Sequence, residues 1–218
     1  MRRLAIFDVD GTLVDSQGHI QAAMATAFSE TGLAAPDRAA VRSIIGLSLP
    51  VAVARLAGGP APEIVERYKA AYVALAAEEG SAEAAPLFPG ARAALDALAA
   101  EGVVLGIATG KSRRGLSVVL ETHGLAGLFE TVQVADDHPS KPHPSMIRAA
   151  VSESSADAAA MIGDTVFDMD MARAAGVPGL GVAWGYHDPK ALEDAGASRV
   201  LRSCGELPRA LLAMWEPT

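Results

Sequence analysis

The sequence contains, near its start, the run Leu4-Ala5-Ile6-Phe7-Asp8-Val9-Asp10-Gly11-Thr12. Four apolar residues followed at once by acidic residues and a glycine are typical of a buried strand that ends in a turn. A strand that is apolar throughout indicates a parallel sheet with helices on both faces. The Asp-x-Asp pair then lies at the carboxyl end of the strand, where open parallel sheets bind their ligands.

Short apolar runs alternate with longer helical patterns along much of the remaining chain. Strands are expected over residues 4–8, 103–109, 131–135, 159–164 and 179–183. Helices are expected over residues 91–101, 113–123, 144–153 and 168–175, with a terminal helix over 206–215. This alternation predicts an α/β fold with a doubly wound, Rossmann-like parallel sheet.

The segment between residues 16 and 85 breaks this alternation. It has no strand-like run, but it has alanine-rich helical stretches near residues 19–31, 37–44, 49–56 and 62–79. A segment of about 70 residues is too long for one crossover helix. We therefore predict a core formed by residues 1–15 and 86–218, with a small α-helical cap domain, residues 16–85, inserted after the first strand.

Composition narrows the class of protein. The 218 residues carry 26 acidic and 18 basic side chains, for a net charge of −8, and 50% of the residues are hydrophobic. This charge balance argues against a nucleic-acid partner, and no uncharged stretch is long enough to span a membrane. Asp8 interrupts the first apolar run well short of a signal peptide. We expect a cytoplasmic protein without membrane or nucleic-acid partners.

Polar residues follow four of the predicted strands, and their chemistry is complementary. These residues are Asp8 and Asp10, then Thr109-Gly110-Lys111, then Lys141, and finally Asp164 with Asp168. Clustered carboxylates repel one another unless a cation neutralises them, and carboxylate oxygens are ligands that Mg²⁺ prefers. A lysine and a hydroxyl can hold a phosphoryl group, and a carboxylate can attack it as a nucleophile.

In these motifs the chain resembles the haloacid-dehalogenase-like (HAD) superfamily. The four motifs occur in the superfamily's order: Asp8-x-Asp10-Gly11-Thr12, Thr109, Lys141-Pro142 and Gly163-Asp164-x-x-x-Asp168. The helical insert lies where that superfamily places a small α-helical cap. The likeness is greatest to phosphoglycolate-phosphatase-like enzymes, through Lys141-Pro142-His143-Pro144 and Ala183-Trp184-Gly185-Tyr186. The resemblance covers nearly the whole chain and implies a Mg²⁺-dependent phosphatase.

The resemblance also implies roles for the acidic residues. Asp8 would be the nucleophile that attacks phosphorus and forms an aspartyl phosphate. Asp10 would protonate the leaving alcohol and then activate the water that cleaves this intermediate. Asp8, the backbone carbonyl of Asp10, and Asp164 would bind Mg²⁺, with Asp168 in support.

Other residues would contact the substrate. By the same resemblance, Thr109 and Lys141 would hold the phosphoryl oxygens, helped by backbone N–H groups around Gly11 and Gly110. Arg42, in the insert, is a candidate for contact with a second charge on the substrate. An exposed helical arginine without such a role explains Arg42 equally well.

Several functions remain open at this point. The motifs handle the phosphoryl group that all such substrates share, so a phosphomutase or a pyrophosphatase of the same superfamily is an alternative. A 2-haloacid dehalogenase is less favoured, because it needs neither a metal nor the second aspartate, Asp10. A phospho-acceptor receiver domain is excluded by placement, since receivers are phosphorylated at the third strand. The expected partner is a small phosphorylated metabolite, and the chain is either a monomer or a homodimer.

Overall fold

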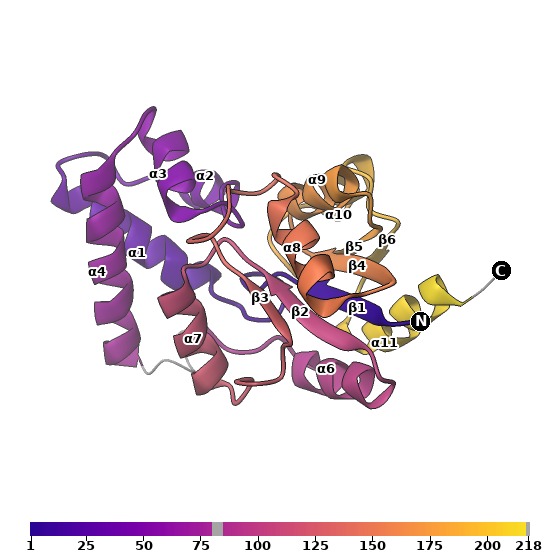
Figure 1. The fold of residues 1–218 in the computed structure, drawn as a ribbon. Helices are drawn as coiled ribbons and strands as arrows, with labels where there is room; N and C mark the ends of the chain where they lie inside the picture. The colour runs from indigo at the N-terminus through magenta and orange to yellow at the C-terminus, as the bar shows by residue number, and fades with distance from the viewer. Residues whose placement is uncertain (80–84, 217–218) are drawn as a thin grey trace.

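A six-stranded parallel sheet forms the centre of the protein in the computed structural model, which describes residues 1–79 and 85–216 (Figure 1). The strands are β1 (Arg3–Phe7), β2 (Val104–Ala108), β3 (Thr131–Gln133), β4 (Ala158–Gly163), β5 (Gly179–Val182) and β6 (Arg199–Leu201). Their order is β3-β2-β1-β4-β5-β6, and every neighbouring pair is parallel. The direction of winding therefore reverses between β1 and β4. This order confirms the predicted doubly wound, Rossmann-like α/β fold.

The sequence did not predict two elements at one edge of the sheet. These are α10 (Pro189–Asp194) and the edge strand β6. β6 has three residues, of which Arg199 is exposed and Val200 is half-buried, so it lacks the continuous apolar run of the inner strands. The inner strands also end earlier than predicted. Among them, β1 ends at Phe7 and β4 at Gly163, directly before Asp8 and Asp164. These aspartates thus begin the loops that leave the sheet.

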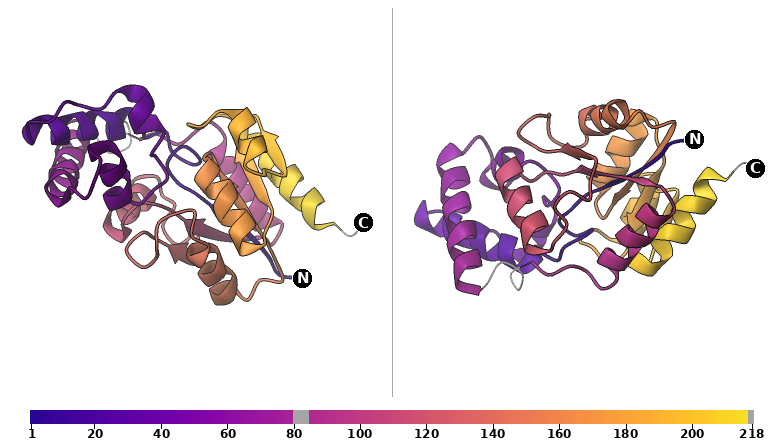
Figure 2. Two further views of the ribbon diagram at one scale, coloured as in Figure 1. Left: turned by 90° about the horizontal axis from the view of Figure 1, so that it is seen from above. Right: turned by 60° about the horizontal axis from the view of Figure 1, so that its bottom comes forward.

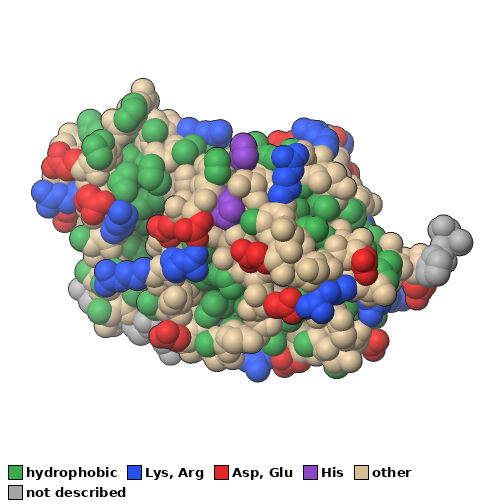
Figure 3. Space-filling model, viewed as in Figure 1, with side chains coloured by type: hydrophobic (Ala, Val, Ile, Leu, Met, Phe, Trp, Pro, Cys, Tyr) green, Lys and Arg blue, Asp and Glu red, His purple; other side chains and the backbone are tan. Residues whose placement is uncertain are grey.

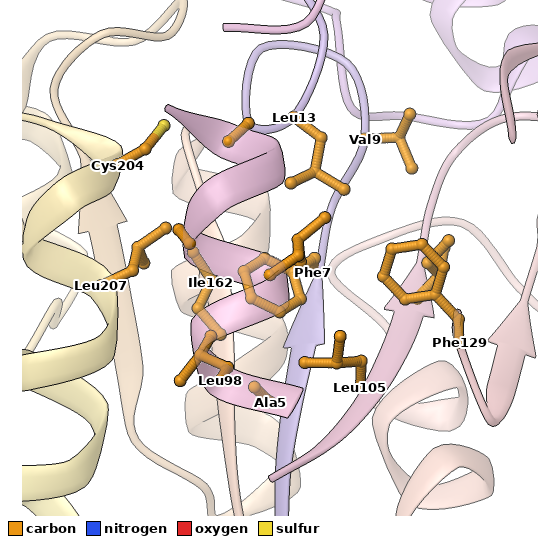
Figure 4. Packing of buried hydrophobic residues seen from close by; sticks show 14 of the residues in the cluster. Ala5, Phe7, Val9, Leu13, Leu98, Leu105, Phe129, Ile162, Cys204 and Leu207 are labelled. Atoms are coloured by element: carbon orange, nitrogen blue, oxygen red, sulfur yellow. The ribbon is translucent and has the colours of Figure 1, made fainter. Parts of the chain in front are cut away.

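Helices cover both faces of the sheet, as the apolar strands predict. One core cluster joins the sheet to α6 (Ala91–Ala100), α7 (Arg113–Thr122) and α11 (Leu207–Trp215), with the short helix η1 (Cys204–Glu206) before α11. The other joins it to α8 (Ser145–Ser154) and α9 (Val166–Ala175). The side chains of β1 alternate between these two clusters. Figure 4 shows Phe7 in the first cluster, close to Leu98 and Ile162.

The segment between β1 and α6 forms helices that lie together beside the sheet. They are α1 (Gln17–Glu30), α2 (Arg38–Arg42), α3 (Leu49–Ala57) and α4 (Pro62–Glu79). These helices share their own apolar cluster, to which the core contributes Phe167 and Tyr186. Figure 2 shows this helical group on one side in both views, with the N-terminus at the opposite end. The cap boundaries at residues 16 and 85 stay a prediction, and residues 80–84 of that range lie outside the described residues.

The chain enters and leaves the helical group at one place. Val14 and Leu87 form an isolated antiparallel bridge. On either side of it, the N–H of Asp15 donates to the carbonyl of Pro86 at 2.8 Å, and the N–H of Phe88 donates to the carbonyl of Leu13 at 2.9 Å. The two connections between core and helices are therefore held side by side.

Two features of the described structure concern membranes and nucleic acids, the two partner classes that composition disfavours. None of the helices within residues 1–79 and 85–216 is long and apolar enough to cross a membrane. On the face shown in Figure 3, the described acidic and basic side chains are interspersed. This face therefore does not present a continuous basic strip of the kind that follows a nucleic-acid backbone.

We expect Phe7→Ala to destabilise the protein strongly, because the Phe7 side chain is fully buried at the centre of the sheet. Truncation of a buried phenylalanine costs about 3–5 kcal/mol of unfolding free energy. Urea unfolding followed by circular dichroism measures this loss. Val118→Ala, at a side chain that is 47% exposed, is the control and should change stability by less than about 0.5 kcal/mol. A loss below about 1 kcal/mol for Phe7→Ala would contradict this description of the core.

Candidate active site

Three buried carboxylates meet at the carboxyl edge of the sheet. Asp8 follows β1, Asp164 follows β4, and Asp168 lies in the first turn of α9. Oxygen atoms of the three lie within 4.8 Å of one another, and each residue is at most 1% exposed. The cluster forms where the strand order reverses, between β1 and β4, which is where open parallel sheets bind their ligands. The structure thus brings together three of the four residues predicted to bind a metal.

Lys141 supplies a positive charge to this cluster. Its Nζ lies 2.9 Å from Oδ1 of Asp8 and 2.7 Å from Oδ1 of Asp168, and its side chain is fully buried. Burial by itself would lower the pKa of Lys141, but the charges of Asp168 and Asp8 raise it above its usual value. Lys141 is therefore a fixed cation beside the predicted nucleophile.

Hydrogen bonds fix the orientation of the other two carboxylates. Asp164 accepts from the hydroxyl of Thr12 at 3.0 Å and from the N–H of Tyr186 at 2.9 Å. Asp168 accepts from the hydroxyl of Thr165 at 2.7 Å and from its N–H at 3.1 Å. The N–H of Asp168 donates in return to the Thr165 hydroxyl at 3.3 Å, and with the bond from the Thr165 N–H this forms a capping box. The box starts α9 two residues before the predicted position and orients Asp168 at the same time.

Asp8 differs from its neighbours because neither of its buried oxygens accepts a hydrogen bond from the described residues. Nζ of Lys141 forms an ion pair with Oδ1 of Asp8 at 2.9 Å, whereas Oδ2 has no polar partner among the described residues. Burial raises the pKa of Asp8 to about 7, against the opposing effect of Lys141 and with a further contribution from Asp168. Burial also raises the pKa of Asp164 well above its usual value. Oδ2 of Asp8 is therefore available for another positively charged or electrophilic partner.

The residues of this cluster fit a divalent metal ion. With all three carboxylates ionised, the cluster and its one ammonium group would carry a net charge of −2, which a divalent cation would balance. Oδ2 of Asp8, which has no polar partner among the described residues, offers a hard ligand atom of the kind that such an ion takes. An acidic cluster suited to a divalent metal is thus present, as predicted.

Asp10 lies apart from this cluster, although it follows Asp8 by two residues. Its carboxylate accepts from Nζ of Lys111 at 2.8 and 3.0 Å, and also from the hydroxyl of Ser16. The N–H of Ser16 donates in turn to the hydroxyl of Tyr186 at 2.9 Å. The side chain of Asp10 is therefore held by its own partners. The predicted metal contact through its backbone carbonyl stays a prediction.

Two of the predicted phosphate-binding residues lie in strand-end loops beside the cluster. Thr109 directly follows β2 and is fully buried, and its hydroxyl accepts from the N–H of Lys111 at 3.2 Å. Gly11 has a φ of +82°, and a Cβ at this position would overlap the carboxylate of Asp164. Glycine is therefore required at position 11, for its conformation and for the close approach.

Gly110, predicted to bind phosphate, packs closely against the helical insert. A Cβ on Gly110 would lie 2.6 Å from the carbonyl oxygens of Gly46 and Leu47, which belong to the loop between α2 and α3. Nearby, the N–H of Ser48 donates to the hydroxyl of Ser140 at 2.9 Å. The insert thus touches the core directly beside the cluster. A phosphate contact at Gly110 stays a prediction.

Arg42, the candidate for substrate contact, lies at the end of α2. Its Nε donates to the backbone carbonyl of Tyr186, next to the loop that holds Asp164. Arg42 therefore links the insert to the core in this structure. Its contact with a substrate stays a prediction.

Sequence patterns alone indicate no role for Lys111 or Ser16, the two side chains that hold Asp10. Lys111 stands in a predicted strand-end motif, Thr109-Gly110-Lys111, so its position was visible in the sequence. Its partner was not, because Asp10 follows a different strand. Ser16 carries no comparable signal, since a serine before a helix is commonly read as a cap.

Comparison with known proteins agrees with this geometry. Residues 5–182 match the family model described as Haloacid dehalogenase-like hydrolase. The chain is 38% identical to "Probable phosphatase IndB" of Dickeya dadantii, over 98% of this chain and 95% of that protein. It is 34% identical to a phosphoglycolate phosphatase of Caulobacter vibrioides, over 95% of this chain and 90% of that protein.

Solved structures show the same relationship. A hydrolase from Pseudomonas syringae superposes with a TM-score of 0.84 at 27% identity, covering 97% of this chain and 99% of that one. A predicted phosphatase from Clostridium acetobutylicum also gives 0.84, at 25% identity, covering 98% and 99%. With the sheet order, the acidic cluster and the family match, the chain belongs to the haloacid dehalogenase-like hydrolase family.

Proposed function

We propose that this enzyme is a Mg²⁺-dependent phosphatase that hydrolyses a small phosphate monoester through an aspartyl phosphate on Asp8. The observation that carries the proposal is the different environment of two neighbouring carboxylates. Asp8 is buried beside Lys141 with no hydrogen bond to its oxygens, whereas Asp10 is held separately by Lys111 and Ser16. Similarity to proteins named as phosphatases supports the phosphatase activity.

In the first step, an oxygen of Asp8 attacks phosphorus and the bond from phosphorus to the alcohol oxygen breaks. Asp10 gives its proton to the departing oxygen, so that an alcohol leaves instead of an alkoxide. Lys141, which lies 2.9 Å from Asp8, neutralises negative charge on the phosphoryl oxygens during the transfer. Thr109 offers its hydroxyl from the neighbouring strand end.

In the second step, Asp10 acts as a base and the aspartyl phosphate is cleaved. Its carboxylate takes a proton from water while the water oxygen bonds to phosphorus. The bond between phosphorus and Asp8 then breaks, which releases inorganic phosphate and restores the carboxylate. Asp10 keeps the proton that it needs for the next first step, so one residue serves both half-reactions.

Asp8, Asp164 and the backbone carbonyl of Asp10 are the groups that would hold Mg²⁺, and Asp168 supports them by fixing Lys141 at 2.7 Å. When bound, the ion supplies positive charge that offsets the clustered carboxylates and the phosphoryl oxygens. The hydrogen bonds from Thr12 and Tyr186 hold Asp164 ready for this role. The three buried carboxylates therefore have a common purpose in the proposal.

We expect purified protein to release inorganic phosphate from p-nitrophenyl phosphate and from small phosphorylated metabolites. EDTA should abolish this activity and added Mg²⁺ should restore it. A panel with phosphoglycolate, glucose 1-phosphate, pyrophosphate and 2-chloropropionate separates the alternatives in one assay. Halide release without phosphatase activity, or isomerisation of the sugar phosphate without phosphate release, would contradict the proposal.

Asp8→Asn should reduce turnover of p-nitrophenyl phosphate to below about 1% of wild type, because an amide is a very poor nucleophile.

The same variant should be more stable than wild type in metal-free buffer at pH 8. Its neutral side chain removes the cost of an ionised, buried Asp8. Circular dichroism at 25 °C checks that the variant remains folded.

The stability difference should depend on pH with a definite sign. The pKa of Asp8 is about 7 in the folded protein and lies near 3.8 when unfolded. Protonated Asp8 thus favours the fold below about pH 4, and this contribution is lost as the pH rises through 7. In EDTA, the advantage of Asp8→Asn should grow from near zero at pH 4 to roughly 2–4 kcal/mol at pH 8. An advantage that does not change with pH would contradict the raised pKa.

Asp10→Asn should lower the rate by roughly 10²–10⁴-fold, the usual contribution of a positioned acid–base group. The loss in kcat/KM should be smaller for p-nitrophenyl phosphate than for phenyl phosphate, because p-nitrophenolate leaves without needing a proton. Steady-state kinetics on both esters measures this difference. Equal losses for the two esters, with phosphorylation rate-limiting, would remove Asp10 from the role of acid.

A further inference from the structure

Lys111 is a buried cation that the proposed chemistry does not use. Its side chain is 10% exposed, and its Nζ lies 2.8 and 3.0 Å from the two oxygens of Asp10. Burial alone would lower the pKa of Lys111, but Asp10 raises it above its usual value, so the lysine stays charged. Because Lys111 contacts both oxygens, it restricts rotation of the Asp10 carboxylate.

The other neighbour of Lys111 comes from the helical insert. Its Nζ lies 5.4 Å from the ring centroid of Tyr72, on α4, within the range of a cation–π interaction. Tyr72 is itself fixed to α1. Its ring packs edge-on against His19 with centroids 4.2 Å apart, and its backbone carbonyl lies 2.8 Å from Nε2 of His19. The position of the Tyr72 ring therefore follows that of the helical group.

Lys111, in contrast, is fixed to the sheet. Its N–H donates to the hydroxyl of Thr109 at 3.2 Å, and its carbonyl accepts from the N–H of Ala135 at 3.0 Å. The contact between Lys111 and Tyr72 thus joins the two parts of the molecule. Lys111, which takes part in this contact, also binds the carboxylate of Asp10 directly.

We propose that Lys111 and Tyr72 are positioning residues for Asp10. The Tyr72 ring keeps the Lys111 side chain in place, and Lys111 keeps the Asp10 carboxylate in place, so Asp10 is correctly oriented when α4 lies against the core. This inference rests on the proposed function, in which Asp10 transfers the proton. It assigns a role in proton transfer to a residue of the helical insert that need not touch the substrate.

The chemistry of the first step gives a specific signature for this role. While the bond from phosphorus to the alcohol oxygen breaks, that oxygen takes the electron pair and the proton of Asp10. A leaving group that is a weak base departs without the proton, whereas a strongly basic one needs it. A misplaced Asp10 should therefore penalise esters in proportion to the basicity of their leaving groups.

The test measures kcat/KM for a series of aryl phosphates, from p-nitrophenyl to phenyl phosphate, with Lys111→Met and Tyr72→Leu. For both variants we expect a loss of less than about 3-fold on p-nitrophenyl phosphate and about 10²-fold on phenyl phosphate. The Tyr72 hydroxyl also interacts with Lys111 and helps to raise the pKa of Lys111. Tyr72→Phe keeps the ring but not this hydroxyl, so it should recover part of the loss. Val73→Ala, at a neighbouring side chain that is 56% exposed, is the control and should match wild type.

Two kinetic outcomes would overturn the inference. Equal losses along the whole series would indicate a structural role for the two residues. A loss confined to phosphoglycolate, whose carboxylate adds a second charge, would mean that Lys111 binds the substrate and does not position Asp10.

A second measurement does not depend on turnover, so it separates this inference from the proposed function. In metal-free thermal unfolding, the double variant Lys111→Met/Tyr72→Leu should lose less Tm than the sum of the two single losses, because each single variant already breaks the contact. Additive losses would overturn the pairing even if the enzyme is a phosphatase. Non-additive losses in a protein without phosphatase activity would overturn the role of the pair in proton transfer, while the contact itself stands.

Discussion

The repulsion among three buried carboxylates is the constraint on which the rest of this structure depends. Asp8 comes from the end of β1, and Asp164 and Asp168 come from the junction of β4 and α9; each would be more stable in water than beside the others. The fold holds them together with one ammonium group, Lys141, and with directed hydrogen bonds from neighbouring loops. The reversal of strand order, the glycine at position 11 and the capping box of α9 all serve this arrangement. The site is thus a high-energy cluster supported by a stable sheet.

Much of the fold could be predicted because local signals agreed with it. The run before Asp8 is apolar on both faces, and such a run suits only a strand that is covered on both sides. β6 and α10 escaped prediction for the opposite reason. β6 is short and partly exposed, so its pairing with β5 depends on the neighbouring strand more than on its own side chains. The positions of β6 and α10 are therefore determined by contacts with the rest of the sheet, which local sequence patterns do not show.

The candidate site could also be predicted only in part, and for the same reason. The meeting of Asp8, Lys141, Asp164 and Asp168 could be expected, since parallel strands deliver their ends to one edge. The packing of Gly110 against the loop between α2 and α3 could not, and neither could the pairing of Lys111 with Asp10 and Tyr72. Each of these contacts joins segments that are remote in the sequence, and the side chains carry no mark of their partner. The sequence thus indicated the residue types of the site better than the contacts between the insert and the core.

The antiparallel bridge between Val14 and Leu87 also affects how such a protein can diverge. The bridge joins the two chain segments that connect the sheet to the helical insert. The insert is therefore a loop whose two ends are held together, whatever its length. The entropy of closing a loop at such a junction rises only by about 0.6 kcal/mol for each doubling of loop length. Helices of different number and length can therefore be exchanged at this junction without a change in strand register. The fold thus separates the strand-end residues that carry the chemistry from a part that can be replaced, and a change in that part can alter specificity.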